Sequence, residues 1–518
     1  MRLDRNLCHL RILAFIGVIG LWNQAASADP ISPERMSTAL SKLEALAQGA
    51  VADGAVPGLA IAVVHDDEVV FLKGFGHREA GKPEAVDPDT VFQIASLSKP
   101  VSATVVAALV SDGVVSWDSR IADLDPGFRL ADPYPTSQLT VRDLFAHRSG
   151  LPGTAGDDLE DIGYDRATIL HRLRFVPPSS SFRAGYSYSN FGLTEGAVAA
   201  AMPTGKSWEE VAEEKLYRPL GMASTSSRLA DFVMHADRAA LHVRVDGAWA
   251  AKIKRDPDAQ APAGGVSSTA RDLSQWVRLL LGDGAYAGKP LIAADALAQT
   301  HVPLMTRGKN PVSGGESFYG LGWNVEFGRH GLSWGHAGAF SVGARTVVTL
   351  FPKEKLGIAI LTNAFPTGAP EGLSDSFADL VFDGSVEKDW IGAWDAIYAD
   401  LFGPAVEAAK AAYAKPPSPA RPAAPAGAYI GHYANDFIGQ AVVSGAGDGL
   451  VLKLGPAGAR SYSLKHFDGD IFLTFPDAET PNRPAGVSFV VGPDGKASAV
   501  TIDFLDDNHM GTLRRVGD

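Results

Sequence analysis

The stretch "IASLSKPVSATVVAALV", residues 94–110, decides how the chain is interpreted. It places Ser96 and Lys99 three positions apart, ahead of an unbroken run of small, mostly apolar residues. Residues at i and i+3 share one face of a helix, so a helix over 97–112 brings both side chains together at its N-terminus, where free backbone N–H groups gather. A serine hydroxyl becomes a useful nucleophile when a neighbouring base takes its proton, and a desolvated lysine can be that base. The alternative is a serine that only caps a buried helix.

Length and charge narrow the class of protein. The chain has 518 residues, 46% of them hydrophobic, so at least two folding units are expected. Its formal net charge of −13 argues against nucleic acid or an anionic membrane surface as a partner. The scattered histidines show no metal-binding spacing, and no metal or organic cofactor is expected. Nothing in the sequence indicates an oligomeric state.

The first 28 residues have the composition of a secretory signal peptide. Arginines precede an apolar stretch over 12–22, and Ala26-Ser27-Ala28 offers a cleavage site. The stretch is about half of the ~20 residues that a membrane helix needs, so we expect cleavage, no stable membrane insertion, and a periplasmic or extracellular location; a retained anchor is the alternative. Cys8, the sole cysteine, leaves with this leader, which excludes disulfides and thiol catalysis in the mature chain.

Two predicted hairpins bracket a mostly helical region. The segments "GLAIAVVHDDEVVFLKGFG" (58–76) and "ARTVVTLFPKEKLGIAILTNA" (344–364) each contain two strands rich in β-branched residues around a polar turn. Helical patterns lie between them, over 97–112, 207–221 and 268–284. Strands near both ends of a domain, with helices between, predict an α+β fold in which an antiparallel sheet is flanked by helices.

The chain changes character after residue 388. Apolar residues at helical spacing predict a helix over 389–413. The segment "KPPSPARPAAPAG" (415–427) is a proline-rich, semi-rigid spacer. Beyond it, 428–518 alternates apolar and polar residues between Gly- and Asp-rich turns, which predicts a small all-β domain. The expected organisation is a signal peptide (1–28), a first domain (29–402), a helix end and linker (403–427), and a small β-barrel-like domain (428–518).

Two further motifs follow Ser96 and Lys99 along the chain: Tyr188-Ser189-Asn190 and, just before the second hairpin, His336-Ala337-Gly338. With these three motifs the chain resembles the serine β-lactamase and penicillin-binding-protein superfamily, particularly its class C-like branch, which orders its motifs Ser-x-x-Lys, Tyr-x-Asn and Lys-Thr-Gly or a variant such as His-x-Gly. The resemblance covers about 30–365 and implies a helical lobe beside the sheet. It also runs through the stretches "LTVRDLFAHRSGLP" (139–152), "RPLGMAST" (218–225), "AGGVSSTARDLSQW" (263–276) and "YGLGW" (319–323).

A second set of matches in the same order tests this assignment. It begins at Ser385, Tyr433 and His509. A Ser-x-x-Lys match arises roughly once or twice by chance in a chain of this length. The second set is split by the proline spacer, its serine opens a charged helix as an N-cap, and no pair of strands follows its last motif. The Ser96 set is therefore preferred.

The resemblance implies a role for each motif residue. Ser96 is the acylated nucleophile, and Lys99 is its proton acceptor or electrostatic partner. Tyr188 is the second proton-transfer group, while Asn190 positions Lys99 and the substrate. Because an ammonium stabilises the anion of a nearby phenol, Tyr188 is expected to be a usable general base. An aromatic side chain that only packs between the domains is the alternative for Tyr188.

The third motif implies the oxyanion site. The family places its two donors on the backbone N–H of the serine and of the residue after the motif, here Ala339, and Gly338 lets the strand approach a substrate closely. His336 departs from the lysine that β-lactamases carry. A histidine is mostly neutral above its pKa of ~6.5, so capture of a substrate carboxylate should be weaker and pH-dependent. A structural histidine is the alternative.

These features predict a secreted serine hydrolase that works through a covalent acyl-enzyme. Its expected substrates are small esters, amides and short peptides, including D-configured ones, because His-x-Gly is similar to what D-aminopeptidases and related family esterases carry. The alternatives are a class C-like β-lactamase or D-Ala-D-Ala carboxypeptidase, and a penicillin-binding sensor or scaffold without turnover. The trailing β domain is expected to cap the cleft, bind a partner or stabilise the protein.

Overall fold

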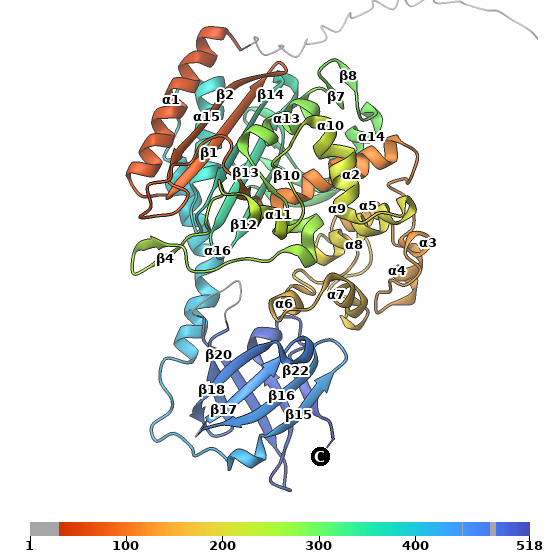
Figure 1. Ribbon diagram of the computed structural model, residues 1–518, viewed down its shortest axis with the longest axis vertical. Helices are drawn as coiled ribbons and strands as arrows, with labels where there is room; N and C mark the ends of the chain where they lie inside the picture. Colours follow the sequence, from red (N-terminus) through yellow and green to blue (C-terminus); the bar gives the residue numbers. More distant parts are fainter. Residues whose placement is uncertain (1–30, 448, 477–482, 518) are drawn as a thin grey trace, which may run out of the picture.

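The computed structural model describes residues 31–447, 449–476 and 483–517 (Figure 1). The leader expected over 1–28, together with Cys8, lies outside the described residues. Within the described part of the chain, no helix is both long enough and apolar enough to cross a membrane.

An eight-stranded antiparallel sheet forms the centre of the larger domain, in the order β2-β1-β14-β13-β12-β11-β10-β9. Its strands are β1 (Gly58–His65), β2 (Glu68–Gly76), β9 (Met305–Lys309), β10 (Glu316–Tyr319), β11 (Asn324–Gly328), β12 (Gly331–Phe340), β13 (Ala344–Phe351) and β14 (Leu356–Thr362). Strand β1 pairs with β14 from the far end of the domain, as expected for a sheet completed by distant segments. Both predicted hairpins are present, and Asp66 and Asp67 form the first turn with positive φ. The predicted α+β fold is confirmed.

Helices cover both faces of this sheet (Figure 1). Along β1, Leu59, Ile61 and Val63 face a core shared with α1 and α15, whereas the alternate residues face the core on the other side, which contains α2, α8 and α13. The α-helices are α1 (Pro33–Ala52), α2 (Ser98–Ser111), α3 (Ile121–Leu124), α4 (Pro133–Gln138), α5 (Val141–Phe145), α6 (Asp157–Asp161), α7 (Arg166–Arg172), α8 (Asn190–Ala201), α9 (Trp208–Ala212), α10 (Arg218–Leu220), α11 (Leu229–Met234), α12 (Ala261–Gly264), α13 (Ala270–Leu281), α14 (Ala294–Ala298), α15 (Ala369–Phe382) and α16 (Trp390–Ala412).

The three helices expected between the hairpins are present. The first is α2, the third is α13, and the second is divided into α9, a π-helical turn (Glu213–Tyr217) and α10. Ser207 and Glu210 form a capping box at its start, and Gly221 ends it in the left-handed region. Short two-stranded ladders join β3 (Phe92–Gln93) to β6 (Ser267–Ser268), β4 (Val243–Val245) to β5 (Ala248–Ala250), and β7 (Ala285–Tyr286) to β8 (Lys289–Pro290).

The segment before the second hairpin differs from expectation. The sequence predicts helices and loops here apart from a strand around Gly338, but β9 to β12 extend the sheet, and the stretch 306–318 is a hairpin rather than a loop. Strand β9 is polar and largely exposed at the sheet edge. An edge strand of this kind lacks the alternating apolar pattern that identifies half-buried strands.

The C-terminal β domain is a closed eight-stranded barrel. Its strands are β15 (Gly431–Asn435), β16 (Gly439–Ala446), β17 (Gly449–Leu454), β18 (Arg460–Asp468), β19 (Ile471–Thr474), β20 (Ala485–Val491), β21 (Ala497–Ile502) and β22 (Thr512–Arg515). Helix α16, expected over 389–413, passes residue 402 and ends at Ala412, and the proline-rich segment follows it.

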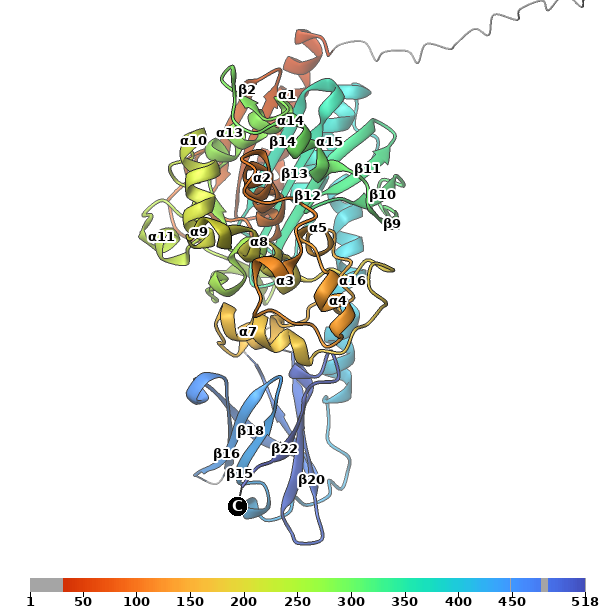
Figure 2. The ribbon, with the colours of Figure 1, turned by 90° about the vertical axis from the view of Figure 1, so that its right-hand side faces the viewer.

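The barrel lies against α6 and α7 of the larger domain (Figures 1 and 2). The Arg172 guanidinium donates to the carbonyl oxygens of Phe437 and Ile438 at 3.0 and 2.9 Å. Gly455 sits in the left-handed region, and a Cβ on it would lie 2.0 Å from the Ile162 carbonyl oxygen. The glycine therefore permits this close approach of the two domains.

Candidate active site

Ser96 lies on a tight turn just before the long buried helix. The turn is a 3₁₀ segment, Ala95–Leu97, that runs directly into α2, so Ser96 precedes the α-helix rather than opening it. Ala95 has a φ of +49°, in the left-handed region that is unfavourable for residues other than glycine. Strained backbone of this kind is common at functional sites. Ser98 holds the turn, because its hydroxyl donates to the Ala95 carbonyl at 2.6 Å and accepts from the Val266 N–H at 2.9 Å.

Lys99 is fully buried beside Ser96. Its Nζ lies 3.0 Å from Ser96 Oγ, 2.7 Å from Asn190 Oδ1 and 2.9 Å from the Ala263 carbonyl oxygen. Burial lowers the pKa of Lys99 from 10.5 to about 7, although the charge of Asp157 acts in the opposite direction. A lysine with this pKa is neutral in about half of the molecules near pH 7 and can accept a proton there.

Tyr188 completes the cluster at Ser96. Its phenol is hydrogen-bonded to Ser96, and Lys99 Nζ lies 4.5 Å from the centre of its ring. Burial nevertheless raises the pKa of Tyr188, in contrast to the expectation that the ammonium would stabilise its anion. Because Lys99 is itself easily deprotonated, it gives the phenolate little support. Tyr188 is therefore suited to relaying a proton as a neutral phenol.

The third motif lies on β12 and faces the turn that carries Ser96. A Cβ on Gly338 would lie 2.2 Å from the Ile94 carbonyl oxygen and 2.9 Å from the Leu97 backbone nitrogen, so only glycine permits this contact. The contact brings Ala339 into the same cavity as Ser96 and Asn190. This is the neighbourhood that an oxyanion site formed by the N–H groups of residues 96 and 339 requires.

His336 is buried and neutral. Its Nε2 lies 3.0 Å from Tyr319 Oη, and its Nδ1 lies 2.7 Å from the Ala337 carbonyl oxygen. Burial, followed by the nearby charge of Lys99, lowers the pKa of His336 to about 3. The expected pH dependence of carboxylate capture is therefore corrected, because residue 336 supplies no cation at any ordinary pH.

The cavity at Ser96 is shared by the two domains. It has a volume of about 330 Å³ and runs from Ser96 between α6 and the barrel. Phe504, Asp507 and Asn508 of the barrel line it together with Asp157 and Asp158 of α6. Of the three expectations for the β domain, the structure thus favours a domain that bounds the active-site cleft.

Comparison with known proteins identifies the family. Residues 43–381 match the family described as Beta-lactamase. The chain belongs to this family. Residues 415–513 match a second family, DUF3471, described as a domain of unknown function.

Individual relatives agree with this assignment. Penicillin-binding protein 4 of Amycolatopsis lactamdurans is 30% identical over 334 residues, which cover 60% of this chain and 81% of the relative. An unguisins hydrolase of Aspergillus violaceofuscus is 25% identical over 514 residues, covering 89% and 88% of the two chains. The octameric penicillin-binding protein homologue from Pyrococcus abyssi shares the fold, with a TM-score of 0.58 at 19% identity over 91% of this chain and 99% of the other. The protein is a serine hydrolase of β-lactamase fold.

Two aromatic residues of this β-lactamase-family site were not assigned from the sequence. The ring of His147 lies 4.6 Å from that of Tyr188, and its Nδ1 accepts from the Ser189 N–H at 3.1 Å. Tyr319 contacts His147 and bonds His336. Both residues lie in stretches that carried the resemblance, "LFAHRSG" and "YGLGW", but only the fold shows that they form a wall behind Tyr188.

Two ion pairs to the buried Asp143 join the segments that carry this wall. Asp143, fully buried on α5, accepts from Arg148 Nε at 2.7 Å and from Arg183 Nη2 at 2.7 Å. Arg183 precedes the Tyr188 motif, and Arg148 follows His147 by one position. The three side chains therefore fix the loop after α5 against the segment leading to Tyr188.

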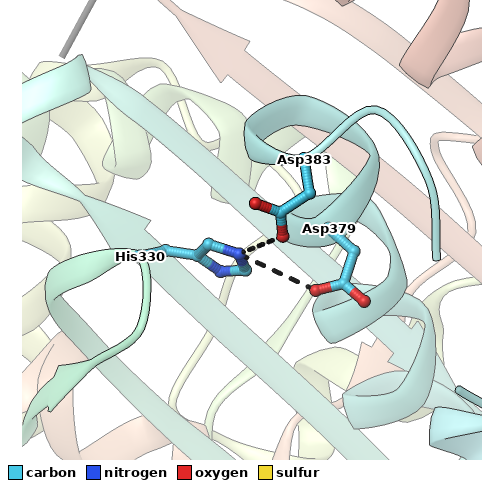
Figure 3. Close-up of side chains that lie close together, drawn as sticks. All are labelled: His330, Asp379 and Asp383. Atoms are coloured by element: carbon cyan, nitrogen blue, oxygen red, sulfur yellow. Dashed lines mark hydrogen bonds and ion pairs between the residues drawn. The ribbon is translucent and has the colours of Figure 1, made fainter. Parts of the chain in front are cut away.

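One cluster could in principle hold a metal ion. Among residues 31–447, 449–476 and 483–517, one group of ligand-type side chains lies close enough together: His330, Asp379 and Asp383 (Figure 3). The Arg329 guanidinium already contacts both carboxylates, and it reaches Asp379 at 2.8 Å. The ring of His330 stacks on Phe382. The cluster is therefore an ion-pair network around Arg329 that ties the turn before β12 to the end of α15.

Proposed function

We propose that the protein hydrolyses small esters, amides or short peptides, D-configured ones included, through an acyl-enzyme on Ser96. The observation that carries this proposal is Lys99, a buried amine 3.0 Å from Ser96 Oγ with a pKa of about 7. In acylation, Ser96 Oγ bonds to the substrate carbonyl carbon while its proton passes to Lys99. The C–O or C–N bond to the leaving group then breaks.

Proton return to the leaving group falls to Tyr188. Its phenol is bonded to Ser96 and lies against Lys99, so it can pass a proton on while Lys99 replenishes it. Water then attacks the ester carbonyl of the acyl-enzyme, giving its proton to Lys99, and the acid leaves as Ser96 recovers its hydrogen. The N–H groups of residues 96 and 339 are the proposed oxyanion donors in both steps.

A neutral residue 336 argues against an efficient β-lactamase or D-Ala-D-Ala carboxypeptidase. The lysine that β-lactamases and D-Ala-D-Ala peptidases carry at this position supplies a cation facing the carboxylate of the substrate, whereas His336 is uncharged at neutral pH. Esters, amides and peptides recognised through other groups do not have this requirement.

The proposal includes secretion and the division of labour along the chain. We propose that residues 1–28 are a cleaved signal peptide, that 29–402 form the catalytic domain, that 403–427 link it to the barrel, and that 428–518 complete the substrate cavity. The barrel residues Phe504 and Asp507 in that cavity support the last assignment. N-terminal sequencing of protein recovered from the periplasm tests the first.

Turnover is the decisive experiment. Purified mature protein is expected to hydrolyse p-nitrophenyl acetate or butyrate, and Ser96→Ala should abolish this with an unchanged circular dichroism spectrum and Tm. A stable acyl adduct by mass spectrometry without product indicates the sensor instead. Rapid nitrocefin hydrolysis with negligible ester and peptide cleavage indicates the β-lactamase.

A further inference from the structure

Asn190 lies between a cation and a carboxylate. Lys99 Nζ donates to its Oδ1 at 2.7 Å, and its Nδ2 donates to Asp157 Oδ2 at 2.9 Å. The oxygen and the NH₂ of an amide occupy nearly the same volume, so only hydrogen-bond partners decide which of them faces a given group. A half-turn of this amide would set its NH₂ against the amine of Lys99.

Packing of the preceding turn fixes the position of Asp157. Gly156 precedes it with a φ of +96°, and a Cβ there would lie 2.8 Å from the Ile169 side chain and 3.1 Å from Phe191. The turn is therefore pressed onto α7 and α8. This seats Asp157 at the start of α6, within reach of the first residue of α8.

The burial of Asp157 is energetically unfavourable. Its Oδ1 is shielded from solvent and has no hydrogen-bond partner. Burial and the charge of Glu160 raise the pKa of Asp157, while the bond from Asn190 lowers it. Buried groups with unsatisfied polar atoms and shifted pKa values cluster at functional sites.

We propose that Asp157 is a positioning residue for the Ser96 reaction, because its acceptance of the Asn190 NH₂ keeps the amide oxygen directed at Lys99. It acts through Asn190 and does not touch the reacting atoms. This inference rests on the proposed hydrolysis. It adds to the three motifs a fourth residue, which no motif contains.

A double-mutant cycle tests the inference. The rate constant kcat/KM for p-nitrophenyl butyrate is measured for the wild type, Asp157→Ala, Asp157→Asn, Asn190→Ala and the double variant Asp157→Ala/Asn190→Ala. Asp436→Asn, at an exposed barrel position outside the cavity, is the matched charge control. Circular dichroism and Tm identify any variant that fails to fold.

Misplacing a group that holds the general base should lower kcat/KM roughly tenfold to a hundredfold in Asp157→Ala. Asp157→Asn keeps an acceptor oxygen and should recover most of this loss. In the Asn190→Ala background, measured at a pH above the pKa of Lys99, Asp157→Ala should change kcat/KM by less than about twofold. The hydrogen bond to Asn190 is then absent, and the charge of Asp157, which raises the pKa of Lys99, no longer changes the fraction of neutral lysine.

Losses of kcat/KM that add up in the double variant overturn the positioning role, as does an Asp157→Asn variant as slow as Asp157→Ala. The proposed function stands in either case as long as turnover depends on Ser96. A wild-type protein that turns over no ester, amide or peptide refutes both.

Discussion

The burial of Lys99 predicts how turnover depends on pH. A solvated lysine is neutral in roughly one molecule in 3,000 at pH 7. With its pKa lowered to about 7, Lys99 is neutral in about one half. The difference corresponds to roughly 5 kcal/mol in the free energy of deprotonation.

In the proposed mechanism Lys99 must be neutral to accept the Ser96 proton, so we expect activity to be lost as the pH falls through the pKa of Lys99. We expect log kcat/KM for p-nitrophenyl butyrate to rise with a slope of one up to about pH 7 and then level off. The plateau should continue through pH 9, because burial raises the pKa of Tyr188 and the phenol stays protonated. His336 should not contribute to the change in rate, because burial lowers its pKa to about 3. Burial also lowers the pKa of His147 well below its usual value.

Two variants test whether Lys99 causes the rise of log kcat/KM between low pH and pH 7, the acid limb of the profile. Lys99→Arg keeps the charge but cannot deprotonate, so kcat/KM should fall roughly 10²- to 10⁴-fold. In His336→Gln the limb should remain where it is. A limb near pH 6.5 that disappears in His336→Gln, or a wild-type profile that is flat between pH 5 and 9, would refute the assignment of Lys99 as the base.

Two predictions concern stability. Both carboxylate oxygens of the buried Glu195 lack hydrogen-bond partners, so Glu195→Leu should raise the free energy of unfolding by about 1–3 kcal/mol. Burial raises the pKa of Glu195, so the native state retains a proton that the unfolded chain releases, and the advantage of leucine in urea denaturation should grow above about pH 4.3; a variant less stable than the wild type contradicts this. Arg345 Nε donates to Glu371 at 2.8 Å in the core, so Arg345→Met should lower the free energy of unfolding by about 3–5 kcal/mol. The double variant Arg345→Met/Glu371→Gln should recover part of this loss, because no unpaired carboxylate remains in the core. If urea denaturation shows no recovery, the loss comes from packing alone.

Local sequence signals predicted much of the fold. The two hairpins, the helix after Ser96 and the barrel all have short-range patterns, and each corresponds to elements of the structure. Strands β9 to β11 were not predicted, because pairing near a polar sheet edge depends on the neighbouring strand rather than on a strand's own periodicity. Of β12, only the part around Gly338 was expected as a strand.

The candidate site was predicted as a set of residues but not as an electrostatic system. The structure brings Ser96, Lys99, Tyr188 and Asn190 together, with Ala339 in the same cavity. Asp157 was not found, since a lone aspartate between two motifs has no distinguishing spacing.

The sequence by itself determined which residue types follow one another at helical or strand spacing, and hence the order of elements and the motifs upon them. Only the tertiary structure decided the charge states, namely that Lys99 titrates near neutrality and that His336 stays uncharged. It also decided that the barrel borders the cavity. The physical reason is that desolvation depends on every atom that surrounds a group, and most of those atoms come from segments distant in the chain.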